Sequence, residues 1–248
     1  RHAITKLGYL HFTSTEEYRR RVIQLGEDPD RVFNVGALGV ENILREPLVT
    51  RSELEDALDF PLDRPYAVVT FHPVTLEENS SERQFRALLD ACGSCEDMKF
   101  IFTKANADAH GRVINQMIDE FVQARKNAIA VSSLGVKLYL SALKYSAMVV
   151  GNSSSGIIEA PSFGIPTVNI GDRQRGRVQA SSVINCEPVK EDILRAIRIA
   201  MSEEFRTVAR KTVNPYGDGH TSERIVRVLK QYMLKEKLDL KKRFFDWR

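Results

Sequence analysis

The sequence predicts an α/β protein built on an open, parallel, doubly wound sheet. Five short apolar runs alternate with stretches of helical periodicity, and these runs are YAVVTFHP, MKFIFTKAN, AIAVSSL, AMVVGNS and PTVNIG. Strands and helices that alternate at this length form right-handed crossovers and place helices on both faces of the sheet. The apolar runs are continuous, as expected where both faces are covered. We therefore expect a Rossmann-like domain over residues 61–221.

The residues before this domain read as the end of another one. RHAITKLGYLHFTST passes from a helical pattern into a strand, with no Met ahead of it. TEEYRRRVIQLG and TRSELEDALDF are predicted helices, and RVFNVGALGVENI is predicted as a strand that enters a glycine-containing loop. PLDRP is rich in turn residues and is the expected linker. We expect residues 1–60 to be the end of a preceding Rossmann-like domain whose first part is absent.

Composition narrows the class of protein. The 248 residues are 43% hydrophobic, and 36 Lys and Arg against 33 Asp and Glu leave a net charge of +3. Nucleic-acid binding usually needs a clustered basic face, and so small an excess does not indicate one. No apolar run approaches the ~20 residues that span a bilayer, and no signal peptide is visible. We expect a cytoplasmic protein with neither nucleic acid nor membrane as a partner.

The cysteines indicate neither disulfides nor metal. Cys92, Cys95 and Cys186 are few and odd in number. The first two form C-x-x-C, but no second ligand pair sits at zinc spacing, and the motif closes a predicted helix where a redox motif would open one. We interpret them as ordinary thiols and expect no metal.

Polar residues follow each predicted strand of the second domain. Ligands bind beyond the carboxyl ends of the strands in an open α/β sheet. The polar segments that follow these carboxyl ends are residues 72–75, 103–108, 132–134, 152–156 and 171–173. All five are expected at one edge of the sheet, which is therefore the predicted ligand site.

The serine loop is a candidate anion site. Ser153, Ser154 and Ser155 precede a short helix, where hydroxyls and free N–H groups attract a phosphate. Glu159 lies one turn later and suits a ribose diol. The alternative is that the serines cap the helix and Glu159 is solvated. Neither G-x-x-x-x-G-K nor G-x-G-x-x-G is present, which excludes the P-loop and dinucleotide fingerprints.

Two further groups are candidates at the same edge. His72 follows a strand and precedes Pro73, which favours an extended backbone, and its imidazole could assist a leaving diphosphate. The alternative is a histidine held in the crevice wall. Arg173, Arg175 and Arg177 form a basic loop that is either solvated or contacts phosphate through at most one member.

Together these motifs resemble a known family. RHAITKL, FHPVT, N-x-D after the second strand, GNSSSGIIEAPSFGIPTVNIGDRQRGR and NPYGDG…ERI resemble the hydrolysing UDP-N-acetylglucosamine 2-epimerases of sialic acid synthesis, and less closely the non-hydrolysing epimerases. The chain resembles the C-terminal portion of these epimerases. The family implies a glycosyltransferase-B-like fold of two Rossmann-like domains, with a UDP-sugar in the cleft. It also implies that residues 222–248 are a C-terminal helix that crosses back to the first domain.

The resemblance assigns roles around the diphosphate. His72 matches the family's catalytic histidine, and Ser153 and Ser154 match its diphosphate-binding serines. Glu159 matches the acid that holds the ribose, and Arg173 matches an arginine of the nucleotide pocket.

Three more residues receive roles from the same resemblance. Asn106 matches an asparagine on the sugar side, Leu134 would offer its main chain to uracil, and Tyr139 would pack on the base. The implied ligands are a UDP-sugar and UDP, with no cofactor, in a homo-oligomer.

The implied reaction is elimination of UDP across C1–C2 of the sugar, followed by addition of water that releases N-acetylmannosamine. Such an elimination needs a carboxylate base, which in the family precedes RHAITKL and so would lie upstream of Arg1. We expect the chain alone to be inactive. Three alternatives stay open: a UDP-sugar glycosyltransferase, a hydrolysing epimerase that acts on a diacetamido-trideoxy sugar, and a nucleotide-sensing module without turnover.

Overall fold

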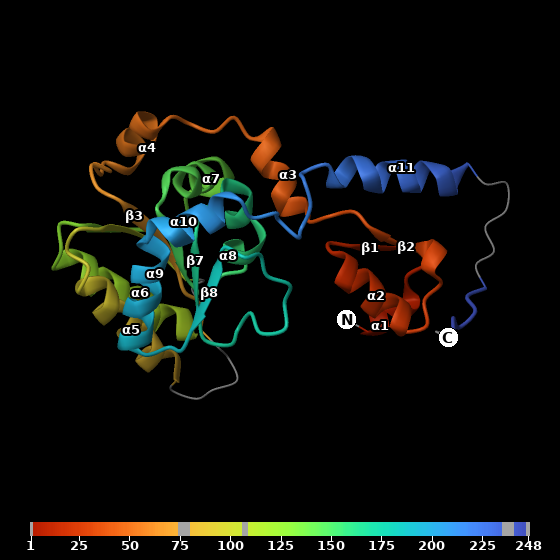
Figure 1. Ribbon diagram of the computed structural model, residues 1–248, viewed down its shortest axis with the longest axis horizontal. Coiled ribbons are helices and arrows are strands. Elements are labelled where there is room, and N and C mark those ends of the chain that lie inside the picture. Colours follow the sequence, from red (N-terminus) through yellow and green to blue (C-terminus); the bar gives the residue numbers. More distant parts are fainter. Residues whose placement is uncertain (1, 74–79, 106–108, 235–240, 247–248) are drawn as a thin grey trace. The chain divides into compact units, whose positions relative to one another are not determined.

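The chain forms two compact units in a computed structural model, which describes residues 2–73, 80–105, 109–234 and 241–246 (Figure 1). The first unit contains Arg1–Arg45 and Asn214–Arg248, and the second contains Glu46–Val213. These units divide the chain near residues 45 and 213, whereas the sequence led us to expect domain limits near residues 60 and 221. The assignment of domains stays a prediction.

A six-stranded parallel sheet forms the centre of the second unit. Its strands are β3 (Tyr66–Thr70), β4 (Lys99–Thr103), β5 (Ala128–Val131), β6 (Met148–Gly151), β7 (Thr167–Ile170) and β8 (Val183–Cys186). Their order is β5-β4-β3-β6-β7-β8, and every neighbouring pair is parallel. The chain therefore builds outward in one direction from β3 and in the other from β6. The boundary between β3 and β6 is the switch point at which such sheets bind ligands.

Helices cover both faces of this sheet, as Figure 1 shows, so the prediction of a doubly wound α/β fold is confirmed. On one face, α5 (Ser80–Gly93), α6 (Ala109–Gln123) and α9 (Lys190–Met201) pack on the sheet. Their buried side chains meet those of the strands in one hydrophobic core, which includes Phe85, Leu88, Ile114, Ile118, Ile193, Phe100, Phe102 and Val150. Burying each such side chain stabilises the fold by roughly 1.5–3 kcal/mol.

The other face carries α4 (Arg51–Leu58), α7 (Gly135–Tyr145), α8 (Ser155–Ile158) and the 3-10 turn η2 (Ala160–Phe163). The Tyr66 hydroxyl donates to the main-chain oxygen of Ala142 in α7 at 2.7 Å. The Thr167 hydroxyl donates to the main-chain oxygen of Gly156 in α8 at 2.7 Å. These two bonds join α7 to the first residue of β3 and α8 to the first residue of β7.

Two elements of the second unit were not predicted. Strand β8 pairs with β7 at the edge of the sheet. Helix α10 (Glu203–Arg210) follows α9 after a single residue, Ser202. The Ser202 N–H closes α9 by donating to Ile199, while its hydroxyl accepts from the N–H of Phe205 in α10. One serine thus ends one helix and caps the next.

The first unit contains a two-stranded parallel sheet, β1 (His11–Thr13) and β2 (Val32–Asn34). Its other elements are α1 (His2–Leu7), α2 (Glu16–Gln24), the turn η1 (Pro29–Arg31), α3 (Leu38–Arg45) and α11 (Thr221–Met233). Thr15 caps α2 by accepting from the N–H of Tyr18. No helix in the described part of the chain is both long and apolar enough to cross a membrane.

Helix α3 stands where a loop was predicted. Its residue Glu41 is 4% exposed and accepts bonds from the N–H and the hydroxyl of Ser222 at the start of α11. A carboxylate at a helix N-terminus satisfies free N–H groups and opposes the helix dipole, so Glu41 joins α3 to α11. The last helix was expected over residues 222–248, but α11 ends at Met233 and residues 241–246 are not helical. Residues 235–240 and 247–248 lie outside the described residues.

Candidate functional site

The ends of β3 and β6 meet closely at the switch point of the sheet. Gly151 of β6 stands opposite Thr70 of β3, and the N–H of Asn152 donates to the Thr70 carbonyl at 3.1 Å. Gly151 has φ +134°, and a Cβ at this position would lie 2.0 Å from the Thr70 oxygen. Only glycine allows this approach. The polar residues that follow both strands are therefore brought together.

Asn152 connects three strand ends. Its side chain is buried, and its Oδ1 accepts from the N–H of His72 at 2.7 Å while its Nδ2 donates to the carbonyl of His72 at 2.8 Å. The main-chain oxygen of Asn152 accepts from Arg173 Nη1 at 2.9 Å and from Gln174 Nε2 at 2.7 Å. Residues that follow β3, β6 and β7 thus share one hydrogen-bonded junction, and it contains two of the predicted site residues, His72 and Arg173.

His72 is half-buried at the end of β3. Burial lowers the pKa of its imidazole, and the positive charge of Arg173 lowers it further. The ring is therefore mainly neutral at pH 7 in the unliganded site. An anion that neutralised Arg173 would raise the pKa of His72 and favour uptake of a proton, which is the response expected of a histidine that assists a leaving phosphate.

The serine loop only partly caps the helix that follows it. Ser153 Oγ accepts from the N–H of Ser155 at 3.3 Å. Ser154 occupies the N-cap position of α8, but its side chain makes no capping hydrogen bond. Helix α8 is a single turn, so hydroxyl and N–H groups count for more here than a helix dipole. The Ser154 hydroxyl is available to a ligand.

Glu159 is not the solvated side chain of the alternative interpretation. It ends α8, and its Oε2 is buried without a hydrogen-bond partner among the described residues. Burial raises its pKa to about 7, although the nearby Ser155 hydroxyl lowers it. A buried carboxyl oxygen without a partner is costly, and a hydroxyl donor from a ligand such as a ribose diol would satisfy it.

Tyr139 and Leu134 both belong to the α7 region. Burial raises the pKa of Tyr139, whose hydroxyl lies near Ser155 and Thr70, between the serine loop and the end of β3. Leu134 is half-buried and immediately precedes the first residue of α7. The remaining predicted site residue, Asn106, lies outside the described residues.

Two site residues were not singled out from the sequence. Asn152 and Gln174 are both 1% exposed, and Gln174 Oε1 has no partner among the described residues. A signal for Asn152 was present, because an asparagine directly after a glycine-terminated strand marks a polar group at the switch point. Its bonds to His72 cross 80 positions of sequence and are not visible in a local pattern.

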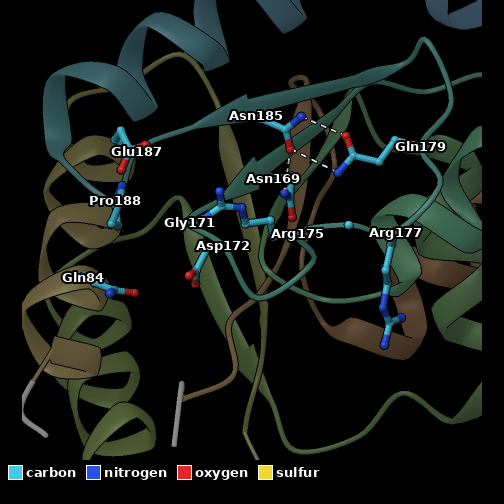
Figure 2. A pocket seen from close by; sticks show the side chains of 11 residues that line it. Gln84, Asn169, Gly171, Asp172, Arg175, Arg177, Gln179, Asn185, Glu187 and Pro188 are labelled. Carbon is cyan, nitrogen blue, oxygen red and sulfur yellow. Dashed lines mark hydrogen bonds between the residues drawn. The ribbon is translucent and has the colours of Figure 1, made fainter. Parts of the chain in front are cut away.

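The three arginines of the loop after β7 separate into two sets. Arg173 belongs to the Asn152 junction, whereas Arg175 and Arg177 line a hollow of about 640 Å³ beyond β7 and β8 (Figure 2). The hollow is polar and is lined by Gln84, Asn169, Gly171, Asp172, Arg175, Gly176, Arg177, Gln179, Asn185, Glu187 and Pro188. Figure 2 shows the amides of Asn169, Asn185 and Gln179 joined by hydrogen bonds.

The three cysteines are free thiols whose burial disfavours the thiolate form. Cys92 is buried, and Cys95 and Cys186 are half-buried. Burial raises the pKa of all three, and that of Cys186 to about 12. The described residues contain no group of three His, Cys, Asp or Glu side chains placed to hold a metal ion.

Comparisons with known proteins identify the family. The family described as UDP-N-acetylglucosamine 2-epimerase matches residues 1–230. The polysialic acid biosynthesis protein P7 of Escherichia coli is 42% identical over 99% of this chain and 62% of its own length. The hydrolysing GDP/UDP-N,N'-diacetylbacillosamine 2-epimerase of Campylobacter jejuni is 39% identical over 83% of this chain and 53% of its own length. The chain thus spans 53–62% of the length of these two curated relatives.

Solved structures show the same fold. A structure of Staphylococcus aureus MnaA with UDP matches the whole chain, and 65% of its own, with a TM-score of 0.78 at 20% identity. The Methanocaldococcus jannaschii UDP-GlcNAc 2-epimerase in complex with UDP-GlcNAc and UDP matches 91% of the chain, and 62% of its own, with a TM-score of 0.74 at 18% identity. The six-stranded Rossmann-like sheet corresponds to the C-terminal portion of these glycosyltransferase-B-like structures. The chain belongs to the UDP-N-acetylglucosamine 2-epimerase family.

Proposed function

We propose that the full-length protein containing this chain is a hydrolysing UDP-N-acetylglucosamine 2-epimerase, which converts UDP-N-acetylglucosamine and water to N-acetylmannosamine and UDP. The observation that carries this proposal is the Asn152 junction, at which His72 and Arg173 are held beside the serine loop. The Campylobacter jejuni relative is named as a hydrolysing 2-epimerase, which supports the hydrolysing type. The Escherichia coli relative is named for polysialic acid biosynthesis, which agrees with a role in sialic acid synthesis.

The nucleotide is bound by the residues at the switch point. Ser153 and Ser154 hydrogen-bond the diphosphate, and Arg173 contributes a guanidinium to its oxygens. Glu159 accepts hydrogen bonds from the two ribose hydroxyls, which is supported by its unpartnered Oε2. These four groups hold the part of the substrate that leaves.

Three other residues complete the proposed substrate contacts. Leu134 offers main-chain groups to the uracil edge, and Tyr139 lies on the base side of the pocket. Asn106 binds the sugar. These assignments rest on the family resemblance, to which the position of Tyr139 near Thr70 and Ser155 adds a second reason to place it by the nucleotide.

The reaction proceeds in two steps. A carboxylate base removes the proton from C2, the C2–H electron pair forms the C1=C2 double bond, and the C1–O bond breaks with its electrons leaving on UDP. His72 hydrogen-bonds or protonates the departing phosphate oxygen. Water then adds its hydroxyl to C1, and a proton reaches C2 from the opposite face, which inverts that centre. The family resemblance places the base ahead of RHAITKL, so residues 1–248 alone are expected to bind UDP without turnover.

The identity of the sugar on the substrate is tested by supplying two UDP-sugars. Full-length protein is incubated with UDP-N-acetylglucosamine or with a UDP-diacetamido-trideoxy sugar, and the released UDP and free sugar are identified by NMR. N-acetylmannosamine from the first substrate, without any acceptor, supports the proposal and argues against a glycosyltransferase. Turnover of the second substrate alone would assign the activity named for the Campylobacter jejuni relative. UDP binding without release of sugar from either would contradict an epimerase.

A further inference from the structure

We propose that Asn152 is a positioning residue that holds His72 through its main chain and ties the place of the imidazole to the loop that carries Arg173. This inference deepens the proposed function and rests on it for the identity of the reaction. Asn152 does not itself contact the reacting atoms in this account. It acts through its neighbours.

The side chain of Asn152 is matched to the main chain of His72 by two bonds of opposite direction. Its Oδ1 accepts from the His72 N–H at 2.7 Å, and its Nδ2 donates to the His72 carbonyl at 2.8 Å. A primary amide carries its acceptor and its donor on two separate atoms, side by side. A carboxylate has no donor, and the single oxygen of a serine hydroxyl lies on a shorter side chain, so neither replaces the amide. Because Asn152 is buried, losing either bond would leave a buried polar group unpaired.

The two hydrogen bonds from the Asn152 amide matter because His72 lies beyond the end of its strand. β3 ends at Thr70, and Pro73 has no main-chain N–H to donate to a neighbouring strand. The imidazole makes no hydrogen bond to another described residue, so the hydrogen bonds that hold residue 72 there act on its main chain. A displacement of about 1 Å in a catalytic group can cost on the order of 100-fold in rate.

The same residue reaches the loop after β7 through a different group. Arg173 Nη1 and Gln174 Nε2 donate to the main-chain carbonyl of Asn152, and Ser153 is the next residue in the chain. A ligand that bound the serine loop and Arg173 would therefore act on both sides of the residue that holds His72. The lowered pKa of His72, caused by burial and by the Arg173 charge, agrees with this closeness.

Asn152 holds His72 with its side-chain amide and the Arg173 loop with its main-chain carbonyl, so its effect on His72 can be measured apart from nucleotide binding. Asn152→Ala removes the amide that holds His72 but keeps the carbonyl that receives Arg173 and Gln174. We expect the affinity for UDP to stay within about threefold while His72 loses its position. Asn169→Ala is a matched control, because Asn169 is also a buried asparagine, and its amide bonds Asn185 instead of the main chain of His72.

The first measurement needs no turnover. Residues 1–248 are labelled at histidine, the His72 signal is assigned with His72→Gln, and its titration is followed by NMR. In Asn152→Ala the pKa of His72 is expected to rise toward its ordinary value of 6.5, while in Asn169→Ala it stays at the wild-type value. A folded Asn152→Ala chain with the wild-type His72 titration would overturn the inference. If Asn152→Ala does not fold, Asn152→Ser carries the same test with a neutral side chain too short to make both bonds.

The second measurement uses turnover by the full-length protein. Asn152→Ala is expected to lower kcat at least tenfold with KM within about threefold. In a His72→Gln background the same substitution should add no further loss, since it acts through His72. An equal loss in both backgrounds would contradict the inference. Failure of wild-type protein to turn over a UDP-sugar would sink the proposed function, while the NMR titration would still decide the role of Asn152.

Discussion

The carbonyl oxygen of Thr70 lies so close to Gly151 that a Cβ on Gly151 would stand 2.0 Å from it. This contact joins β3 and β6 at their carboxyl ends, directly before His72 and the serine loop. The backbone of Gly151 has φ +134°, which L side chains rarely adopt. Site and fold therefore depend on the same glycine.

Replacing Gly151 with alanine is expected to destabilise the second unit severely, by at least about 3 kcal/mol, because main chain must move to admit the Cβ. Urea unfolding measures the effect. Gly176→Ala is the control, since Gly176 also has positive φ (+76°) but open space around its Cβ, and its cost should be about 1–2 kcal/mol. Equal losses in the two variants would contradict the close approach to Thr70.

Arg173→Ala is expected to weaken UDP binding by about 10- to 100-fold, because a charged hydrogen bond to an anion contributes roughly 1.5–3 kcal/mol. Isothermal titration calorimetry with residues 1–248 gives the affinity. Arg175→Ala removes the same charge from the same loop, but Arg175 lines the polar hollow of Figure 2 and should change the affinity less than threefold. A larger effect at Arg175 than at Arg173 would place the nucleotide in that hollow instead.

Glu159→Gln is expected to stabilise the protein more at pH 8 than at pH 5. The pKa of Glu159 is raised from 4.5 to about 7 in the folded chain, so the folded state retains a proton that the unfolded state releases. Its contribution to stability is fully present below pH 4.5 and is lost as pH rises through 7, with a total of at most about 3 kcal/mol.

Urea unfolding of wild type and Glu159→Gln at both pH values measures this difference. The exposed Glu204→Gln makes the same change of charge on α10 and is the surface control. If the difference in free energy of unfolding between wild type and Glu159→Gln does not grow from pH 5 to pH 8, Glu159 is solvated. That is the alternative interpretation of the sequence.

His72→Gln is expected to lower kcat of the full-length protein by about 100- to 10,000-fold, the usual contribution of a general acid or base. UDP affinity should change only a few-fold, because Asn152 bonds the main chain at residue 72 and keeps its partner in the variant. Steady-state kinetics and calorimetry separate the two effects. Unchanged kcat would assign His72 to the crevice wall, and a wild type that binds UDP without turnover would favour a nucleotide-sensing module.

Much of the second unit was predictable because its strands are continuous apolar runs and its helices are amphipathic. The elements that were missed lack those signals. β8 is an edge strand whose four residues, VINC, are half-exposed or exposed and mixed in polarity. α10 begins one residue after α9 ends, so helical periodicity alone does not separate them. α3 begins two residues after Gly36 and contains Gly39, which obscures a helical pattern, and it packs against α11.

The site was predictable to the extent that its residues follow strands in the sequence. His72, Ser153 and Arg173 could be assigned to one edge of the sheet because parallel strands end together. The contacts between them could not, since Asn152 joins segments that are 80 and 21 positions away. The burial of Glu159 likewise depends on tertiary packing and is not visible in the sequence.

The most direct test of the proposed reaction is incubation of the full-length protein with UDP-N-acetylglucosamine in heavy water. Elimination removes the C2 proton, and inversion requires that a proton reach C2 from the other face, from a group that exchanges with solvent. The expected products are UDP and free N-acetylmannosamine that carries one deuterium at C2. Free sugar that retains hydrogen at C2, or no free sugar at all, would contradict it.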